Sequence, residues 1–358
     1  MGMRGIDFKL ETVTALFMHG FQVDRNTRVA ELRPASVDGV TRYWYRAMLG
    51  AHLGLGEIRQ REARVLGSAE SGAGVAFVIE SRTPGKRDRP LLPQHAGGGQ
   101  PRGGGGGGRS HPSPSPSIDP GHSFTLRLLR PRASFPESDL VEAAWAFWAA
   151  VHLGGFGQRA RRGAGSLRIL EVEPAGGSSS LALPPATPDT ANSQALARFL
   201  GTGLAAMRLA VRATNGVRPK PRSFPWLAAD LNEGSLSSIQ VVDLGEGVRD
   251  EQGARAAVMR GLQRYKSPVF GLPYMKEAPG DPQIKGGSIR HASPVWIHIH
   301  RGGGPPGPGP TRFLSTVTWL PSDSLGTGIR GISQEQVQRL HRYLEELPGT
   351  RVQVGGGA

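Results

Sequence analysis

The sequence predicts an α+β protein in which one β-α-β-β-α-β order of elements occurs twice. Segments with apolar residues at every second position indicate strands, and segments with the 3.6-residue apolar period indicate the helices between them. Two stretches rich in glycine and proline, residues 83–121 and 302–310, interrupt the chain at equivalent places, between the second and third strands of each repeat. With these two stretches set aside, the duplication becomes apparent.

The first repeat begins with IDFKLETVTALF, whose alternation indicates a strand. In the following helix, SVDGVTRYWYRAMLG, Ser36 can cap the first turn and Gly50 can end the last one. Near the start of the second helix, Pro136 suits a first turn, and Glu137 and Asp139 favour the positive end of the helix dipole. The predicted elements are a strand at 6–17, a helix at 36–50, strands at 74–81 and 122–130, a helix at 135–155 and a strand at 166–174.

The second repeat follows an additional helix rich in alanine, leucine and arginine at 193–213. Its predicted elements are a strand at 237–245, a helix at 250–264, strands at 293–301 and 312–321, a helix at 334–347 and a short strand at 351–354. This order predicts two tandem ferredoxin-like (βαββαβ, RRM-like) domains with antiparallel sheets, over residues 1–185 and 186–358. We expect residues 83–121 to be a disordered insertion, because they contain too few apolar residues to offset the entropy of ordering them.

The charge of the chain points to a polyanionic partner. Among 358 residues, 43 lysines and arginines outnumber 29 aspartates and glutamates, which gives a formal net charge of +14. A field of this sign attracts nucleic acid. The absence of cysteine excludes disulfides and thiolate metal sites and fits a reducing cytoplasm. The N-terminal residues contain no long apolar run, so we expect a cytoplasmic protein without a membrane partner.

A loop of glycines and arginines, GGFGQRARRGAGSL at 154–167, raises three alternatives. Gly155, Gly157 and Ala160 match the G-x-G-x-x-A fingerprint of dinucleotide sites, but that fingerprint needs a strand before it and a helix after it. Here the order is reversed, so we expect no nucleotide cofactor. The glycines could instead let a phosphate backbone approach closely, and a solvated basic turn is the remaining alternative. The arginines available for phosphate contact are Arg159, Arg161 and Arg162.

The first helix carries two distinct faces. Its apolar face includes Trp44, which we expect in the core rather than stacked on a ligand. On another face Arg42 and Arg46 are four residues apart beside Tyr45, a pattern that suits phosphate contact with base stacking, although an ordinary solvated face fits as well. Asp38 places a negative charge close to this face.

Three histidines carry candidate chemistry. His19, just after the first strand, could act as a general base on a ribose hydroxyl, although a lone loop histidine is more often structural. His298 and His300 share one face of a strand, and no nearby carboxylate–histidine cluster completes a ligand set, so we expect a polar sheet face and no metal. The strand at 122–130 lacks the aromatic residues on which RRM domains stack bases, so RNA contacts are expected from loops and helix ends.

Four blocks of sequence together resemble the RAMP superfamily of CRISPR proteins, and within it the first RAMP subunits of type III-B Cmr effector complexes. These blocks are LRPASVDG followed by RYWYRAML at 32–49, LGSAE at 66–70, the Gly/Arg loop at 154–166 and RHASPV at 290–295. The chain departs from the family pattern at Asp38, where a lysine is usual, and at Leu66 and Ala164, where aromatic residues are usual.

The resemblance implies one subunit of a multisubunit antiviral ribonucleoprotein, which contacts guide RNA and captures target RNA while a different subunit cuts. We therefore expect binding without catalysis, with guide RNA, target RNA and other Cmr subunits as partners. The residues expected to bind RNA are Arg33, Arg42, Arg46, Gly155, Gly157, Arg159, Arg161, Arg162, Arg290 and His291. Two alternatives stay open: a metal-independent RAMP endoribonuclease that processes guide precursors with His19 as base, and a structural subunit that contacts only protein.

Overall fold

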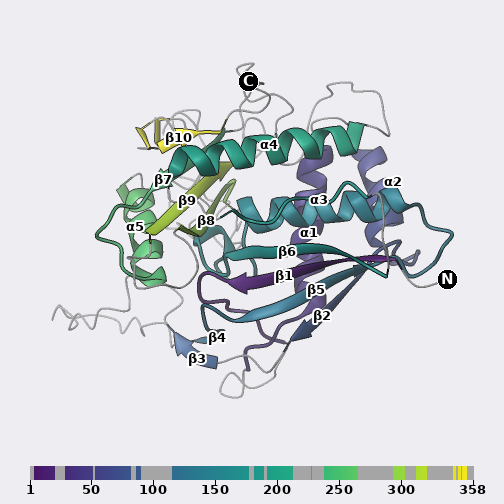
Figure 1. Cartoon of the computed structure of the whole chain (residues 1–358), viewed down its shortest axis with the longest axis horizontal. Coiled ribbons are helices and arrows are strands. Elements are labelled where there is room, and N and C mark those ends of the chain that lie inside the picture. Colours follow the sequence, from purple (N-terminus) through teal and green to yellow (C-terminus); the bar gives the residue numbers. More distant parts are fainter. Residues whose placement is uncertain are drawn as a thin grey trace, which may run out of the picture.

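The computed structural model confirms a mixed α+β protein with two four-stranded antiparallel sheets (Figure 1). It describes residues 4–20, 29–50, 53–81, 86–89, 115–176, 181–188, 192–212, 227, 238–264, 293–302, 312–320, 342–343, 346–347 and 349–352. None of the helices in these ranges is long and apolar enough to cross a membrane.

The first sheet has the strand order β2-β5-β1-β6, and all of its pairs are antiparallel. Its strands are β1 (Gly5–Thr12), β2 (Ala76–Ser81), β5 (Ser123–Leu129) and β6 (Leu167–Ala175). Along β1, Ile6, Phe8 and Leu10 are buried while the residues between them face outward, as the period of two requires. The sheet therefore has one face in the core and one outer face.

Helices α1 (Pro34–Leu49) and α3 (Glu137–Leu153) pack on the inner side of this sheet. Nearly every residue of α3 is buried, because the sheet lies on one side of it and α1, α2 (Leu55–Leu66) and α4 (Ser193–Arg212) lie on the others. Helix α4 extends from α3 to the second sheet, which connects the two halves of the molecule (Figure 1).

One helix was missing from the sequence prediction, α2 (Leu55–Leu66). Its N-terminus is stabilised by Glu57, whose carboxylate accepts the backbone N–H of Gly54 at 2.9 Å. Its buried face includes Arg61, which is paired with Glu142 of α3 at 2.9 Å and forms a second bond to the same carboxylate. Arg61 and Glu62 are charged although they are buried, so the segment has few apolar residues, which explains why the pattern did not reveal it.

The second sheet has the order β10-β7-β9-β8. Its strands are β7 (Ser238–Asp243), β8 (Val295–Gly302), β9 (Arg312–Trp319) and β10 (Gly349–Arg351), and α5 (Glu251–Arg264) contacts β8 and β9. Ranked along the chain, the strands of each sheet are ordered fourth, first, third, second. The predicted helix at 334–347 lies mostly outside the described residues.

The interpretation of residues 83–121 as disordered throughout was wrong at both ends of that stretch. Strands β3 (Lys86–Arg89) and β4 (Ser115–Ile118) pair there as a small antiparallel sheet. Ile118 is fully buried and exchanges backbone hydrogen bonds of 2.9 and 3.1 Å with Leu16. One buried apolar side chain and these backbone contacts thus anchor the C-terminal end of the insertion. Residues 90–114 lie outside the described part.

One hydrophobic cluster contains residues of both sheets, and a second cluster lies on the other face of the second sheet. Ile239, Val241, Trp296 and Leu314 of the second sheet belong to the same buried cluster as the inner residues of the first. The proposed division into domains at 185/186 stays a prediction, but the described residues on its two sides are packed together.

Three histidines lie buried where the halves meet. The ring of His298 on β8 is 4.3 Å from that of His300, and His300 stacks at 6.2 Å on His152 of α3. His298 donates through Nδ1 to the carbonyl of Gly154 at 2.9 Å. The expectation of a polar sheet face at His298 and His300 was therefore wrong, since this face is interior. Burial lowers the pKa of all three rings, that of His298 to about 4.

These histidines make the fold sensitive to acid. Above pH 6.5, the ordinary histidine pKa, their contribution to stability is complete; it falls as the pH drops toward 4, because the unfolded chain binds protons that the buried rings do not. Each histidine contributes at most about 1.4 kcal/mol per pH unit. Urea unfolding followed by tryptophan fluorescence at pH 7.5, 6.5 and 5.5 measures this dependence. The slope should be shallower in His152→Leu, and equal slopes in the two proteins would contradict the account.

Candidate functional site

The Gly/Arg loop, residues 154–166, packs between the end of the first strand and the second sheet. Gln158 donates its backbone N–H to Phe17 at 2.8 Å, and Gly165 donates to Ala15 at 3.0 Å. The short 3-10 helix within the loop, η3 (Ala160–Arg162), contacts β8 and α5. The loop is thus held by both halves of the molecule.

The glycines of this loop are required by its own fold. Gly157 and Gly165 have φ angles of +75° and +62°. A Cβ at 157 would come 2.5 Å from the carbonyl oxygen of Phe17, and one at 165 would overlap the carbonyl oxygen of Phe156. A Cβ at Gly155 would lie 2.9 Å from a backbone oxygen. We expected a ligand to approach Gly155 and Gly157 closely. In the structure the protein's own backbone occupies that space, so the contact of these glycines with RNA stays a prediction.

Two of the three loop arginines join the halves together. The guanidinium of Arg161 lies 5.0 Å from the ring of Tyr43 on α1 and 4.4 Å from the ring of Trp296 on β8, and it donates to the carbonyl of Ser293. Arg162 is buried and donates to the Ser293 hydroxyl at 3.3 Å. Burial lowers the pKa of both arginines, that of Arg162 to about 10. A desolvated cation–π contact is worth about 2 kcal/mol.

Arg159 differs from its neighbours. It is exposed, and its guanidinium has no ion-pair partner among the residues that the structure describes. Its backbone is left-handed, with φ 60° and ψ 21°, the one positive φ outside glycine in the described ranges. Such a conformation costs about 1 kcal/mol and is enriched at functional sites. The loop therefore displays one uncompensated guanidinium toward solvent.

Two predicted residues, His19 and Arg33, are connected to Gln158, the residue before this arginine. Gln158 donates from its side-chain nitrogen to Nε2 of His19 at 2.9 Å, and Arg33 donates to the His19 carbonyl at 3.4 Å. Arg33 also forms an ion pair of 3.2 Å with Glu31. We call His19, Arg33, Gln158 and Arg159 the loop rim. Gln158 was overlooked in the sequence, although it stands inside the quoted motif next to Arg159.

The predicted pair on α1 is turned toward α2 instead. Arg46 binds Glu62 through two bonds of 2.6 and 2.7 Å, and Arg42 donates to Asp38 at 2.9 Å and to the carbonyl of Gly67 at 2.8 Å. These bonds hold α1 against α2, and the phosphate role of both arginines stays a prediction. Arg290 and His291 lie outside the described residues.

The predictions for two aromatic residues of α1, Trp44 and Tyr45, have different outcomes. Trp44 is fully buried, as predicted. Tyr45 is also fully buried and donates to Glu142 at 2.8 Å, so its interpretation as a stacking residue was wrong. The hydrogen bond to a buried carboxylate explains why the phenol lies inside.

The hydrogen bonds of His19 define its tautomer. Nδ1 lies 3.1 Å from the carbonyl oxygen of Gly20 and must carry the proton to donate there. Nε2 is then the acceptor of the Gln158 amide. The lone pair that a general base would use is therefore already occupied.

A cleft of about 390 Å³ lies between the turn after β4 and the start of α5. Arg89 crosses it, with ion pairs of 3.0 Å to both Asp119 and Glu251. With Asp250 also in its lining, its carboxylates outnumber its cations, so it is unsuited to a polyanion. Within the described ranges, no three histidine, aspartate or glutamate residues are grouped to hold a metal ion.

Comparison with known proteins places these features in a family. The model of the RAMP superfamily matches residues 9–168, which include the second half of β1, all of α1 and α3, and the Gly/Arg loop. Residues 9–168 are a RAMP superfamily domain. The chain is homologous to two proteins of Pyrococcus furiosus. It is 28% identical over 188 residues to CRISPR system Cmr subunit Cmr1-2, covering 45% of this chain and 93% of that protein. It is 24% identical over 309 residues to Cmr subunit Cmr1-1, covering 84% of each.

Solved structures share the fold of the RAMP domain and of the rest of the chain. The crystal structure of Cmr1 from Pyrococcus furiosus, in its apo form, superposes with a TM-score of 0.57 at 20% identity, covering 98% of this chain and 99% of that one. A chain in the cryo-EM structure of the type III-B Cmr-beta complex bound to cognate target RNA gives a TM-score of 0.59 at 12% identity, covering 96% and 99%.

The loop glycines give a direct test of the local geometry. Gly165→Ala should lower the free energy of unfolding by at least about 2 kcal/mol. The added Cβ clashes with the carbonyl oxygen of Phe156, and a positive φ is unfavourable for alanine. Gly39→Ala is the matched control: it lies within α1 with open space around it and should stabilise by about 0.5–1 kcal/mol. Chemical denaturation measures both. An unchanged midpoint for Gly165→Ala would show that the loop does not have this conformation.

Proposed function

We propose that the chain is the RNA-binding, non-catalytic subunit of a type III-B CRISPR (Cmr) effector complex, contacting guide RNA and target RNA in antiviral defence. Homology to Cmr subunits over 84% of both chains supports membership of the complex. The observation that carries RNA binding is the exposed Arg159 on the Gly/Arg loop, which has no ion-pair partner in the part of the chain that the structure describes. We also propose that the two sheets, with their identical strand order, are two tandem ferredoxin-like domains.

The loop rim has the chemistry of a phosphate site. The planar guanidinium of Arg159 can donate two parallel hydrogen bonds to phosphate oxygens. Arg33 stands immediately before α1, whose first turn contains no acidic residue, so the partial positive charge of that helix terminus adds to the site. Glu31 weakens this field locally because it pairs with Arg33. The net charge of +14 brings a polyanion toward the chain.

In this proposal the other predicted arginines hold the elements that carry the loop rim in place. Arg161 and Arg162 fix the loop between α1 and β8, which keeps Arg159 displayed. Arg42 and Arg46 fix α1 against Glu62 of α2, which keeps Arg33 at the rim. A direct phosphate contact by any of them requires that these internal bonds be exchanged.

The structure of the His19 environment favours binding over cleavage. A general base must have a free lone pair within reach of the hydroxyl that it deprotonates. His19 uses Nε2 to accept from Gln158, so its ring orders the rim. This arrangement favours the non-catalytic subunit over the endoribonuclease.

RNA affinity should depend on the rim and on salt. Arg159→Ala should weaken binding of a single-stranded RNA by roughly 5–30-fold, and should reduce the slope of log affinity against log salt by about 0.7 for the lost phosphate contact. Arg132→Ala is the control. Arg132 is exposed and follows the C-terminal end of β5, whereas His122 and the loop lie near the N-terminal end of that strand. Fluorescence anisotropy from 50 to 300 mM salt measures both. A flat salt response in the unmodified chain would favour the purely structural subunit.

Incubation with repeat RNA in EDTA tests the enzymatic alternative. We expect the RNA to stay intact with the unmodified chain, because the His19 lone pair is occupied. Cleavage that disappears in His19→Ala would establish the endoribonuclease instead. His19→Gln, which can still hydrogen-bond to Gln158, should keep RNA affinity closer to that of the unmodified chain than His19→Ala does.

A further inference from the structure

The outer face of the first sheet carries charge of the opposite sign to the chain as a whole. Its charged side chains are the outward residues of four strands: Asp7, Lys9 and Glu11 on β1, Glu80 on β2, Arg127 on β5, and Arg168, Glu171 and Glu173 on β6. Five carboxylates against three cations give a local charge of −2 on a chain whose formal charge is +14. This face is a local exception to the composition.

Every cation on this face is already paired. Arg127 binds Asp7 through two bonds of 2.6 and 2.7 Å and Glu80 through one of 2.8 Å. Arg168 lies 3.1 Å from Glu11. The cations therefore have little capacity left for a phosphate.

The surplus carboxylates lie on the two edge strands. Lys9 is shared between Glu171 and Glu173 of β6, which are 47% and 50% exposed. Glu80 on β2 is 57% exposed and has one bond to Arg127. A carboxylate has about four lone-pair sites, so these three groups can accept further donors from solvent or from a partner. Val78 and Leu170, which are exposed on the same two strands, add apolar surface.

We propose that the outer face of the first sheet, defined by these residues, docks a lysine- or arginine-rich surface of another protein. Charge complementarity identifies the partner, because the unused acceptors are carboxylates. The ion pairs hold the side chains in place before docking, which reduces the entropy lost on association. RNA is disfavoured here, since the face is net negative and its outward positions offer no aromatic ring for stacking.

Zero-length cross-linking of the native assembly tests this proposal. The tagged chain is purified from its host with whatever assembles on it, treated with a carbodiimide that couples carboxylates to amines, and mapped by mass spectrometry. We expect Glu80, Glu171 or Glu173 to be joined to lysines of a different protein. Links confined to Lys9, links to a second copy of this chain, or protection of the face by RNA would each overturn the proposal.

Charge reversal gives the matched functional test. Glu171→Lys with Glu173→Lys should reduce the recovery of the cross-linked partner by about tenfold, because like charges then meet across the interface, while RNA affinity is kept or increased. The control with the same change in net charge is Glu70→Lys with Glu246→Lys, at exposed carboxylates outside the first sheet, and it should retain the partner. Equal recovery from the two variants would contradict the proposal.

Two further measurements keep the outcomes separate. Glu171→Gln with Glu173→Gln removes the charge without crowding Lys9, so a smaller loss of partner with an unchanged melting temperature excludes unfolding as the cause. The partner is expected within the multisubunit assembly of the proposed function. A chain that purifies alone would contradict that function, whereas a chain that retains its assembly but shows no links at this face would contradict only the present inference.

Discussion

The arrangement of the molecule depends on the guanidinium of Arg161, which lies against two aromatic rings that also contact each other. Tyr43 belongs to the RAMP domain and Trp296 to the second sheet, so the contact fixes the two halves relative to one another. The same loop also receives His298 at Gly154 and packs Gly163 against Ile299. A cation in this position is protected from solvent. Its attraction to the rings is therefore stronger than it would be at an exposed site. Together with helix α4 and the buried cluster that includes residues of both sheets, this contact joins the two halves.

The loop combines a buried and an exposed use of the same side chain. Arg161 and Arg162 stabilise the junction, while Arg159, two residues earlier, has a strained backbone that turns it to solvent. The glycines allow this because they let the loop reverse against Phe17 and Phe156 without side-chain clashes. A basic motif can therefore be dense in arginine and still present only part of its charge to RNA.

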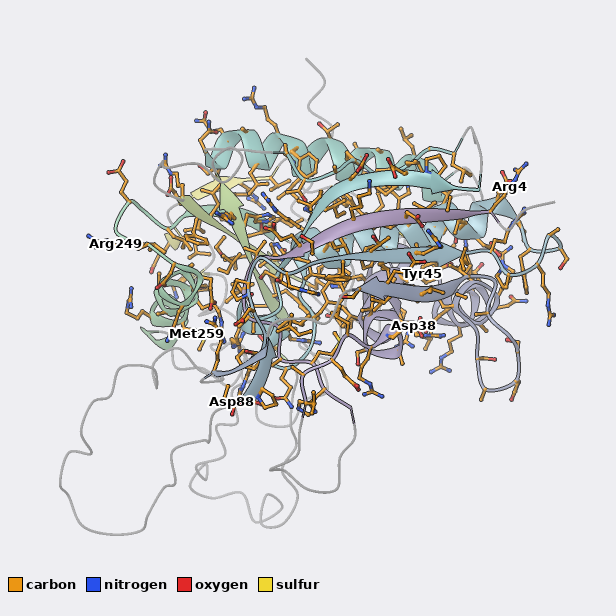
Figure 2. The ribbon with its side chains drawn as sticks, turned by 60° about the horizontal axis from the view of Figure 1, so that its bottom comes forward. Arg4, Asp38, Tyr45, Asp88, Arg249 and Met259 are labelled. Atoms are coloured by element: carbon orange, nitrogen blue, oxygen red, sulfur yellow. The ribbon has the colours of Figure 1, made fainter. Side chains whose placement is uncertain are left out.

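The charged surfaces of the molecule differ in what they can bind. The loop rim presents guanidinium groups next to a helix N-terminus, and the outer face of the first sheet presents half-exposed carboxylates on its edge strands. Figure 2 shows Arg4 and Arg249 projecting from opposite ends of the molecule, and between them many charged side chains point outward. The net charge of +14 is thus unevenly distributed, which lets one chain contact nucleic acid and protein on separate surfaces.

Sequence patterns predicted the strands of the two four-stranded sheets and most helices, because the burial of these elements follows simple periods. The inner residues of β1 and the apolar face around Trp44 are examples. The patterns failed where polar or charged groups are buried. Helix α2 was missed because its buried face includes Arg61, which pairs with Glu142. His298 and His300 were expected on a polar sheet face, although both are interior. The stacking of Arg161 could not be inferred, because Trp296 lies more than a hundred residues away in sequence. The loop rim was only partly predicted, since Gln158 and His19 meet through the fold.

A crystal structure of the chain with a short single-stranded RNA tests the central claim most directly. The account predicts a phosphate within hydrogen-bonding distance of Arg159 and near the N-terminus of α1, with Arg161 still against the rings of Tyr43 and Trp296. RNA lying across the outer face of the first sheet, or Arg161 released from its two rings to hold a phosphate, would contradict it.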